Sequence, residues 1–154
     1  MKKTTILIIG LFMSLSLFAQ SSFDEISILQ ASFGMEKKEI VKSFIQIPED
    51  KSDAFWVLYE EYELKRKKNG KIRIELLTEY AQEWDSLKSE DADRMVLKSI
   101  DLNKNEDKLI ARYYKKIKKA TSPDVAIKFY EVETYIRTTI KFYIKNTIPF
   151  VYQK

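Results

Sequence analysis

Residues 47–62, IPEDKSDAFWVLYEEY, carry a pattern that returns 74 residues later in residues 121–136, TSPDVAIKFYEVETYI. Each copy begins with a short polar turn that contains a proline and acidic residues. Pro48 and Pro123 suit the first positions of a helix, where a proline removes no hydrogen bond within the helix. The neighbouring acidic side chains favour the positive end of a helix dipole. The pattern therefore predicts two helices that begin alike.

In both copies the predicted helix places an aromatic pair and two further apolar residues on one face. These residues are Phe55, Trp56, Leu58 and Tyr62 in the first copy, and Phe129, Tyr130, Val132 and Ile136 in the second. The residues that define the two helix openings are Ile47, Pro48, Phe55 and Trp56, and Ser122, Pro123, Phe129 and Tyr130. The repeat thus extends from the turn into the apolar face of each helix.

The start of the chain has the features of a secretory signal peptide over residues 1–19. Lys2 and Lys3 form a positive start, residues 6–18 are an apolar run of 13 residues, and Ala19 is a small residue at a cleavage position. A membrane anchor is the alternative, but a spanning helix needs about 20 apolar residues. We expect cleavage near Ala19 and an exported, periplasmic protein without stable membrane insertion.

Charge and cysteine content limit the functions and the kinds of stabilisation that the chain can have. The chain has 27 basic and 23 acidic residues, and removal of Lys2 and Lys3 with the signal leaves 25 basic residues and a net charge of +2. A general nucleic-acid binder is more basic, so no nucleic-acid partner is expected. Without cysteine the fold depends on side-chain packing. The remaining length, about 135 residues, suits one domain. We expect a flexible N-terminal arm over 20–33 and a single α-helical domain over 34–154.

Apolar periodicity predicts helices through this domain. A short amphipathic helix is expected over 35–44, and a long helix from about Glu49 to about Ser86 whose apolar phase continues across Asn69 and Gly70. Asn-Gly is a strong turn signal, so two helices broken at that point are the alternative.

Two further helices complete the predicted fold. Ser89 is expected to cap a helix that extends to about Lys119, and the last helix follows Pro123 and ends before Pro149. With three glycines, three prolines and no strand pattern, the expected class is all-α. The predicted architecture is a set of elongated antiparallel helical hairpins with about four helices, one of them long.

The chain contains neither histidine nor cysteine. This composition excludes Ser-His-Asp and Cys-His catalysis and the usual zinc and haem sites. Carboxylate pairs at Glu60 and Glu61 and at Glu79 and Glu83 lie among basic residues at helical spacing, which is typical of a solvated face. We expect no catalytic residue and no cofactor. An enzyme that uses carboxylates alone is our third hypothesis, after the two binding functions described below.

Residues 101–105, DLNKN, resemble the start of a calcium-binding loop. Such a loop requires glycine at its sixth position and glutamate at its twelfth. Here these positions hold Glu106 and Arg112, and the helical apolar phase continues through Leu102 and Leu109. We therefore expect no metal site.

Two basic clusters lie close to tyrosines. The first covers residues 65–73 of the long helix, and the second comprises Arg112, Lys115, Lys116, Lys118 and Lys119. One interpretation is surface charge beside aromatic residues that fill a thin core. The other is a face on which lysine and arginine stems beside tyrosine rings hold apolar or acidic peptide segments.

At the two helix openings the chain resembles the Spy and CpxP family of periplasmic LTxxQ proteins. That family carries two Leu-Thr-x-x-Gln turns, and the second usually reads Leu-Thr-Pro-Glu-Gln with a phenylalanine four residues after the glutamine. Residues 47–51, IPEDK, followed by Phe55, and residues 121–125, TSPDV, followed by Phe129, match that spacing. Lysine and valine replace the two motif glutamines. The resemblance covers the layout of residues 35–143 and lies in spacing, signal peptide and helix order.

The resemblance implies an α-helical homodimer that binds unfolded clients without ATP on a basic and apolar surface. It favours the hypothesis of a periplasmic chaperone or holdase for unfolded or stress-exposed envelope proteins. The alternative is an envelope-stress sensor or regulatory binding protein with one dedicated protein partner. Some relatives sense metals through histidine, which this chain lacks. The residues expected to bind clients are Lys65, Arg66, Arg73, Arg112, Tyr113 and Lys116.

Overall fold

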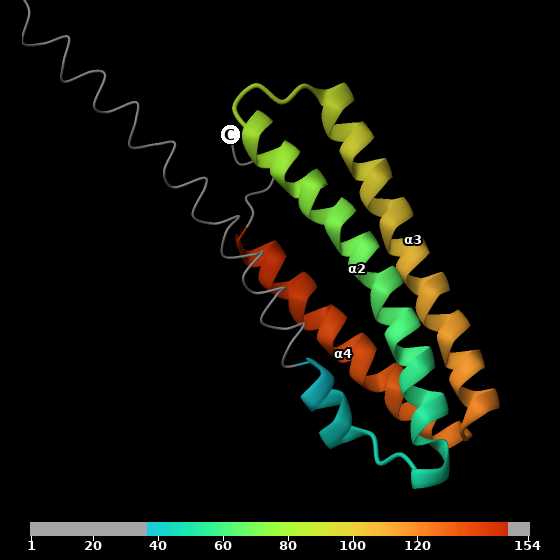
Figure 1. The fold of residues 1–154 in the computed structure, drawn as a ribbon. Helices are drawn as coiled ribbons and strands as arrows, with labels where there is room; N and C mark the ends of the chain where they lie inside the picture. The colour runs from blue at the N-terminus through green and yellow to red at the C-terminus, as the bar shows by residue number, and fades with distance from the viewer. Residues whose placement is uncertain (1–36, 148–154) are drawn as a thin grey trace, which may run out of the picture. The chain divides into compact units, whose positions relative to one another are not determined.

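The structure is a computed structural model that describes residues 37–147. Helical residues 37–44 precede a 3₁₀ turn, η1, at Glu49–Lys51. Three long helices follow, namely α2 at Ser52–Glu83, α3 at Ser89–Ala120 and α4 at Pro123–Thr147 (Figure 1). No strand occurs within residues 37–147, and the predicted all-α class is confirmed. The predicted signal peptide and N-terminal arm lie outside the described residues.

The described helices from Lys38 onward belong to one compact unit. Within it α2 and α3 lie side by side as an antiparallel hairpin, and residues 121 and 122 lead from α3 directly into α4 (Figure 1). Helices α2 and α3 contain 32 residues each. The fold is therefore built on two equally long helices, where we predicted one.

Helix α2 passes through Asn69 and Gly70 without a break. Within residues 37–147 no glycine has a positive φ angle, so Gly70 adopts helical geometry in place of the turn that Asn-Gly often forms. A glycine in a helix costs about 1 kcal/mol relative to alanine. Packing of α2 on α3 at both sides of this point offsets that cost. The prediction of one continuous helix is confirmed.

The two helix openings share residue types but differ in geometry. Pro48 precedes the 3₁₀ turn η1, and α2 begins only at Ser52. Pro123, in contrast, is the first residue of α4. Ser122 Oγ accepts a hydrogen bond of 3.2 Å from Val125 N–H, which satisfies one of the free donors of the first turn. The two helices therefore do not begin alike in their hydrogen bonds.

The start of α3 corrects a further prediction. Ser89 is the first residue of the helix, and Lys88, with φ −90° and ψ 158°, holds the cap position. The Lys88 carbonyl already accepts a backbone hydrogen bond of 3.0 Å from Ala92 N–H. Because helical hydrogen bonding begins one residue earlier than expected, Ser89 cannot be the cap.

An aromatic cluster holds one end of the helices together. Phe55 and Phe129, which occupy equivalent positions of the repeated pattern, are both fully buried. The Tyr62 ring lies 5.2 Å from Phe129 of α4 and 5.6 Å from Tyr113 of α3, measured between ring centroids. A fully buried side chain of this size contributes about 1.5–3 kcal/mol. This cluster therefore joins all three long helices.

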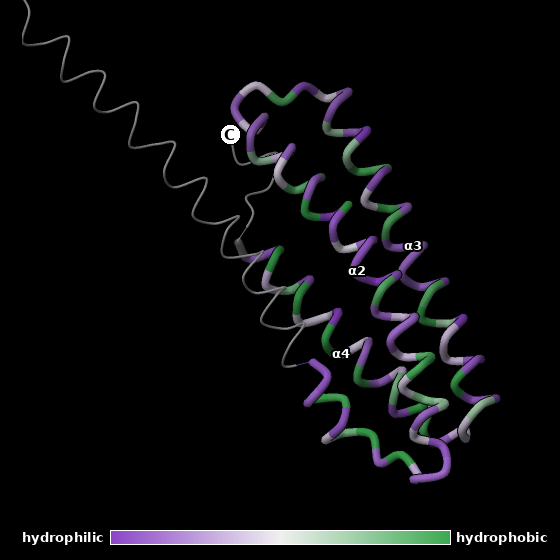
Figure 2. Tube along the Cα trace, viewed as in Figure 1, coloured by the Kyte–Doolittle hydropathy of each residue, from purple (hydrophilic) through white to green (hydrophobic). Residues whose placement is uncertain are grey.

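A second, aliphatic cluster closes the other end of the α2–α3 hairpin. Leu76 of α2 packs with Met95 and Leu102 of α3, and Tyr80 and Leu87 cover them. Figure 2 shows that hydrophilic and hydrophobic positions are interleaved along all three long helices. Between the two clusters the facing positions of α2 and α3 are mainly polar. The hairpin therefore has two apolar ends and a polar middle.

Helix α4 is buried along its first half only. Its buried residues are Val125, Ala126, Phe129, Val132, Glu133 and Ile136. None of the described α4 residues beyond Ile136 is buried, and Phe142 is 68% exposed. No helix within residues 37–147 has both the length and the hydropathy that a membrane crossing requires.

Candidate functional site

A pocket of about 270 Å³ lies in the polar middle of the α2–α3 hairpin. We call it the α2–α3 pocket, and define it by Lys65, Lys68 and Asn69 of α2 and Asn105, Lys108, Leu109 and Arg112 of α3. Residues three, four and seven positions apart share one face of a helix, so the lining residues of each helix lie on one of its faces. Four of the seven side chains are cations, and none of these described lining residues is a carboxylate.

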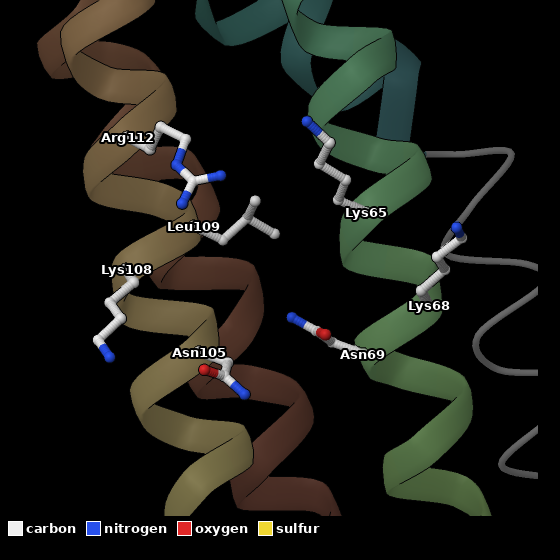
Figure 3. Close-up of a pocket in the computed structure, with 7 residues that line it drawn as sticks. All are labelled: Lys65, Lys68, Asn69, Asn105, Lys108, Leu109 and Arg112. Carbon is white, nitrogen blue, oxygen red and sulfur yellow. The ribbon is translucent and has the colours of Figure 1, made fainter.

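The side chains of the pocket divide into an inner and an outer set. Asn69 and Leu109 point toward each other across the gap, and the Arg112 guanidinium is directed toward α2 (Figure 3). Lys68 and Lys108 lie at the outer edges, with their ammonium groups directed away from the gap (Figure 3). Like charges in one site repel each other, and this arrangement keeps the cations apart.

Tyr113 organises the charged groups at one end of the pocket. Its hydroxyl accepts a hydrogen bond of 2.8 Å from Lys65 Nζ and donates one of 3.1 Å to Glu61 Oε2. Lys116 Nζ pairs with the same carboxylate at 3.3 Å and lies 4.9 Å from the centroid of the Tyr113 ring. The hydrogen bonds from Lys116 and Tyr113 hold the pKa of Glu61 below its ordinary value. One carboxylate thus offsets part of the charge of two lysines.

A part-buried ion-pair network lies at the other end. Arg73 Nη2 donates to Asn103 Oδ1 at 3.1 Å and to Glu106 Oε1 at 3.0 Å. The side chains of Arg73 and Glu106 are only 13% and 14% exposed. Lys141 of α4 approaches the second Glu106 oxygen at 3.6 Å, and burial lowers the pKa of Lys141 despite the attraction of this carboxylate. The network joins α2, α3 and α4.

Arg66 is not part of the pocket lining. Its Nε and Nη2 donate to the two carboxylate oxygens of Glu63 at 2.7 and 2.9 Å. Burial alone would lower the pKa of Arg66, but the hydrogen bond and the charge of Glu63 outweigh burial and raise it. The charge of Arg66 is therefore neutralised on its own helix.

The six residues predicted to bind clients fall into three groups. Lys65 and Arg112 line the pocket together. Tyr113, which is fully buried, binds Lys65, and Lys116 binds Glu61. Arg66 and Arg73 bind carboxylates outside the pocket. Only the first group combines a position in the pocket with an exposed cationic side chain.

Five residues of the pocket were not predicted individually, namely Lys68, Asn69, Asn105, Lys108 and Leu109. Helical spacing was a usable signal for them, because each lies three, four or seven positions from Lys65 or Arg112 on the same helix face. Within residues 37–147 no ion pair or hydrogen bond neutralises Lys68, Lys108 or Arg112. The pocket thus brings together three cations that have no ion-pair partner among the described residues.

The described residues contain no group of acidic side chains that could hold a metal ion. Asp101 and Asn105, the ends of the calcium-loop resemblance, lie inside the continuous helix α3. Comparison with known proteins gives no match: no protein-family model fits the chain, and no curated protein or solved structure is significantly similar to it.

Proposed function

We propose that the chain is an exported, ATP-independent chaperone that holds unfolded or stress-exposed proteins on the rim of the α2–α3 pocket. The observation that carries this proposal is a surface where unneutralised cations adjoin exposed apolar side chains. Leu64, which is 63% exposed, lies one helical turn before Lys68, and Val57, which is 60% exposed, lies two turns before Leu64. Positions with this spacing share one face of α2.

Such a surface suits clients without a fixed shape. Unfolded segments present apolar and acidic side chains in varied order, and lysine and arginine can bind them through both their apolar stems and their charged ends. A surface that does not require one shape can bind many sequences. The layout that resembles the Spy and CpxP family, and the expected signal peptide, support the same function.

The contacts of the predicted residues suggest different roles for them. Lys65 and Arg112 are proposed to touch clients directly, together with Lys68 and Leu64. Tyr113 is buried, so it is proposed to act by holding Lys65 and Lys116 in place. Arg73 is proposed to stabilise the hairpin through Glu106.

The proposal is tested by aggregation of a denatured model protein in the presence of the purified chain. We expect protection at a near-stoichiometric ratio and weaker protection at high salt. The variant Leu64→Ser with Arg112→Glu should lose most of it. The matched control is Val96→Ser with Lys115→Glu, because Val96 is similarly exposed and neither control residue lines the pocket.

Two results would overturn this function. One is the absence of protection at a several-fold excess of the chain. The other is a pull-down from envelope extract that returns one dominant protein, which would favour the regulatory binding protein with a single partner. Export is checked separately by mass spectrometry of the periplasmic product, which should begin near Gln20.

A further inference from the structure

We propose that the α2–α3 pocket binds a compact, multiply charged phosphate anion, such as diphosphate or triphosphate. This inference does not depend on the proposed chaperone function, because it rests on the charge and the volume of the pocket and not on client binding. It concerns the space between the helices, lined by Asn69, Leu109 and Arg112, and the lysines around it.

The charged side chains that line the pocket are all positive. Three cations elsewhere in the hairpin reach the neighbouring helix and meet a carboxylate there: Lys116 meets Glu61, Arg73 meets Glu106, and Arg94 meets Glu79. In the pocket, Arg112 is directed toward α2 and has no ion-pair partner among the described residues, and the lining that it shares with three lysines contains no carboxylate (Figure 3). Like charges one helical turn apart destabilise a helix, so a bound anion would relieve the repulsion between them.

The hydrogen-bond donors of the pocket suit phosphate. Ammonium, guanidinium and amide groups line the pocket from both helices, and phosphate oxygens accept hydrogen bonds from all three. Arginine recognises phosphate through two parallel hydrogen bonds, and lysine adds mobile point charges. Asn69 and Arg112 are already directed into the gap, and Lys68 and Lys108 at the edges can fold inward over a bound anion (Figure 3).

The size of the pocket suits a short phosphate chain. At about 30 Å³ for each molecule of liquid water, a pocket of about 270 Å³ has the volume of several water molecules. A short phosphate chain fits this space, and it concentrates several charges there. An acidic peptide spreads its charges along an extended backbone, so it cannot place as many of them between the two helices.

Side-chain contacts hold both ends of the pocket. Lys65 is held by the hydroxyl of buried Tyr113 at 2.8 Å, and Arg73 is held by Asn103 and Glu106. These fixed groups keep α2 and α3 at the spacing that leaves the pocket open. A site whose supporting groups are already ordered loses less conformational entropy when a ligand binds.

A phosphate group of this kind has two sources, a free anion or the headgroup of a lipid. We would measure binding of inorganic diphosphate and tripolyphosphate to the purified chain by isothermal titration calorimetry at low and high salt. In parallel, we would measure sedimentation of the chain with vesicles that contain phosphatidic acid or, for comparison, phosphatidylglycerol. Phosphatidic acid exposes a terminal phosphate, whereas the phosphate of phosphatidylglycerol is a diester.

The variants separate the pocket from general charge. Lys68→Gln with Lys108→Gln removes two charges from the pocket, and Arg112→Gln alone is a second test. The matched control, Lys67→Gln with Lys115→Gln, removes two exposed charges from the same helices outside the pocket. We expect the pocket variants to bind about tenfold more weakly or worse, because each loses charge-assisted hydrogen bonds. The control should bind almost as the unchanged chain does.

Binding of diphosphate or tripolyphosphate that only the pocket variants weaken supports the proposal with a free anion as ligand. Sedimentation with phosphatidic acid that only the pocket variants weaken supports it with a lipid headgroup as ligand. The proposal is overturned if the chain neither binds these phosphates nor sediments with phosphatidic acid, or if the pocket and control variants weaken binding equally. Pocket-dependent binding of a poly-glutamate peptide without phosphate binding also overturns it, and assigns the pocket to acidic protein segments.

Discussion

Tyr62 Oη donates a hydrogen bond of 2.8 Å to Glu133 Oε2 and so joins α2 to α4 inside the core. The Tyr59 hydroxyl lies 3.4 Å from the other oxygen of the same carboxylate, and Tyr59 and Glu133 are 74 residues apart in the chain. The equivalent positions of the repeated pattern therefore meet in the structure. A buried carboxylate is tolerated only where hydrogen bonds replace its hydration, and the two tyrosines contribute to that replacement.

Tyr62→Phe should destabilise the fold by about 1.5–3 kcal/mol, because it removes a hydrogen bond from a buried charged group. Urea unfolding monitored by circular dichroism measures the change. Tyr135→Phe is the matched control, since Tyr135 lies on the same helix as Glu133 and is 74% exposed. Equal stability of the two variants would show that the Tyr62 bond adds nothing to the core.

Stability should fall at alkaline pH. Burial, and after it the charge of Glu133, raises the pKa of Tyr59 and Tyr62 above the ordinary value of 10.0. The unfolded chain releases both protons above that pH, whereas the folded chain keeps them. Their contribution is therefore fully present below about pH 10 and declines above it, with a slope of up to about 2.7 kcal/mol per pH unit for the pair.

Urea midpoints measured across this range test the alkaline slope. The double variant Tyr59→Phe with Tyr62→Phe begins from a lower stability, but its stability should depend less steeply on pH. A slope that is identical with and without the two hydroxyls would contradict the assignment to these tyrosines.

Gly70→Ala should stabilise the chain by up to about 1 kcal/mol, because Gly70 has helical geometry and alanine has the higher helix propensity. Ala111→Gly, at an exposed position of α3, should give a similar effect of opposite sign. Thermal unfolding compares the two substitutions. Destabilisation by Gly70→Ala would show that the Cβ atom clashes in the polar middle of the hairpin.

Two ion pairs of similar length should differ in their contribution to stability. Arg73 and Glu106 are largely buried at 3.0 Å, whereas Arg94 binds Glu79 at 2.8 Å on the surface. Arg73→Met leaves a buried carboxylate with one partner fewer and should cost about 3 kcal/mol. Arg94→Met should cost less than about 1 kcal/mol. Equal losses in urea unfolding would mean that length, and not burial, governs these pairs.

Local sequence patterns were sufficient for the helices and their order. The apolar phase across Asn69 and Gly70 correctly outweighed the turn signal, because the phase reflects packing along the whole of α2 and the turn signal reflects two residues. The prediction of Ser89 as the cap of α3 was wrong, because the residue at which helical hydrogen bonding begins depends on the path of the preceding loop. A shift of one residue in the start of a helix cannot be predicted from the local sequence.

The site was less accessible to sequence reasoning. The basic clusters could be seen, but which lysine meets a carboxylate depends on how α2 and α3 are aligned along each other. That alignment places Lys116 beside Glu61 and leaves Lys108 unneutralised. It is set by the aromatic cluster at one end and the aliphatic cluster at the other, and both combine residues that are distant in the chain.

Helix α4 is buried only along its first half, and this affects the order in which parts of the fold open. Regions with few buried contacts exchange their amide hydrogens through local opening, at a lower free energy than global unfolding requires. The half of α4 beyond Ile136, where no described residue is buried, should therefore exchange early. The half that contains Glu133 should exchange together with α2, because the Tyr62 bond lies within their shared core. Helix α4 thus spans two cooperative units within one continuous helix.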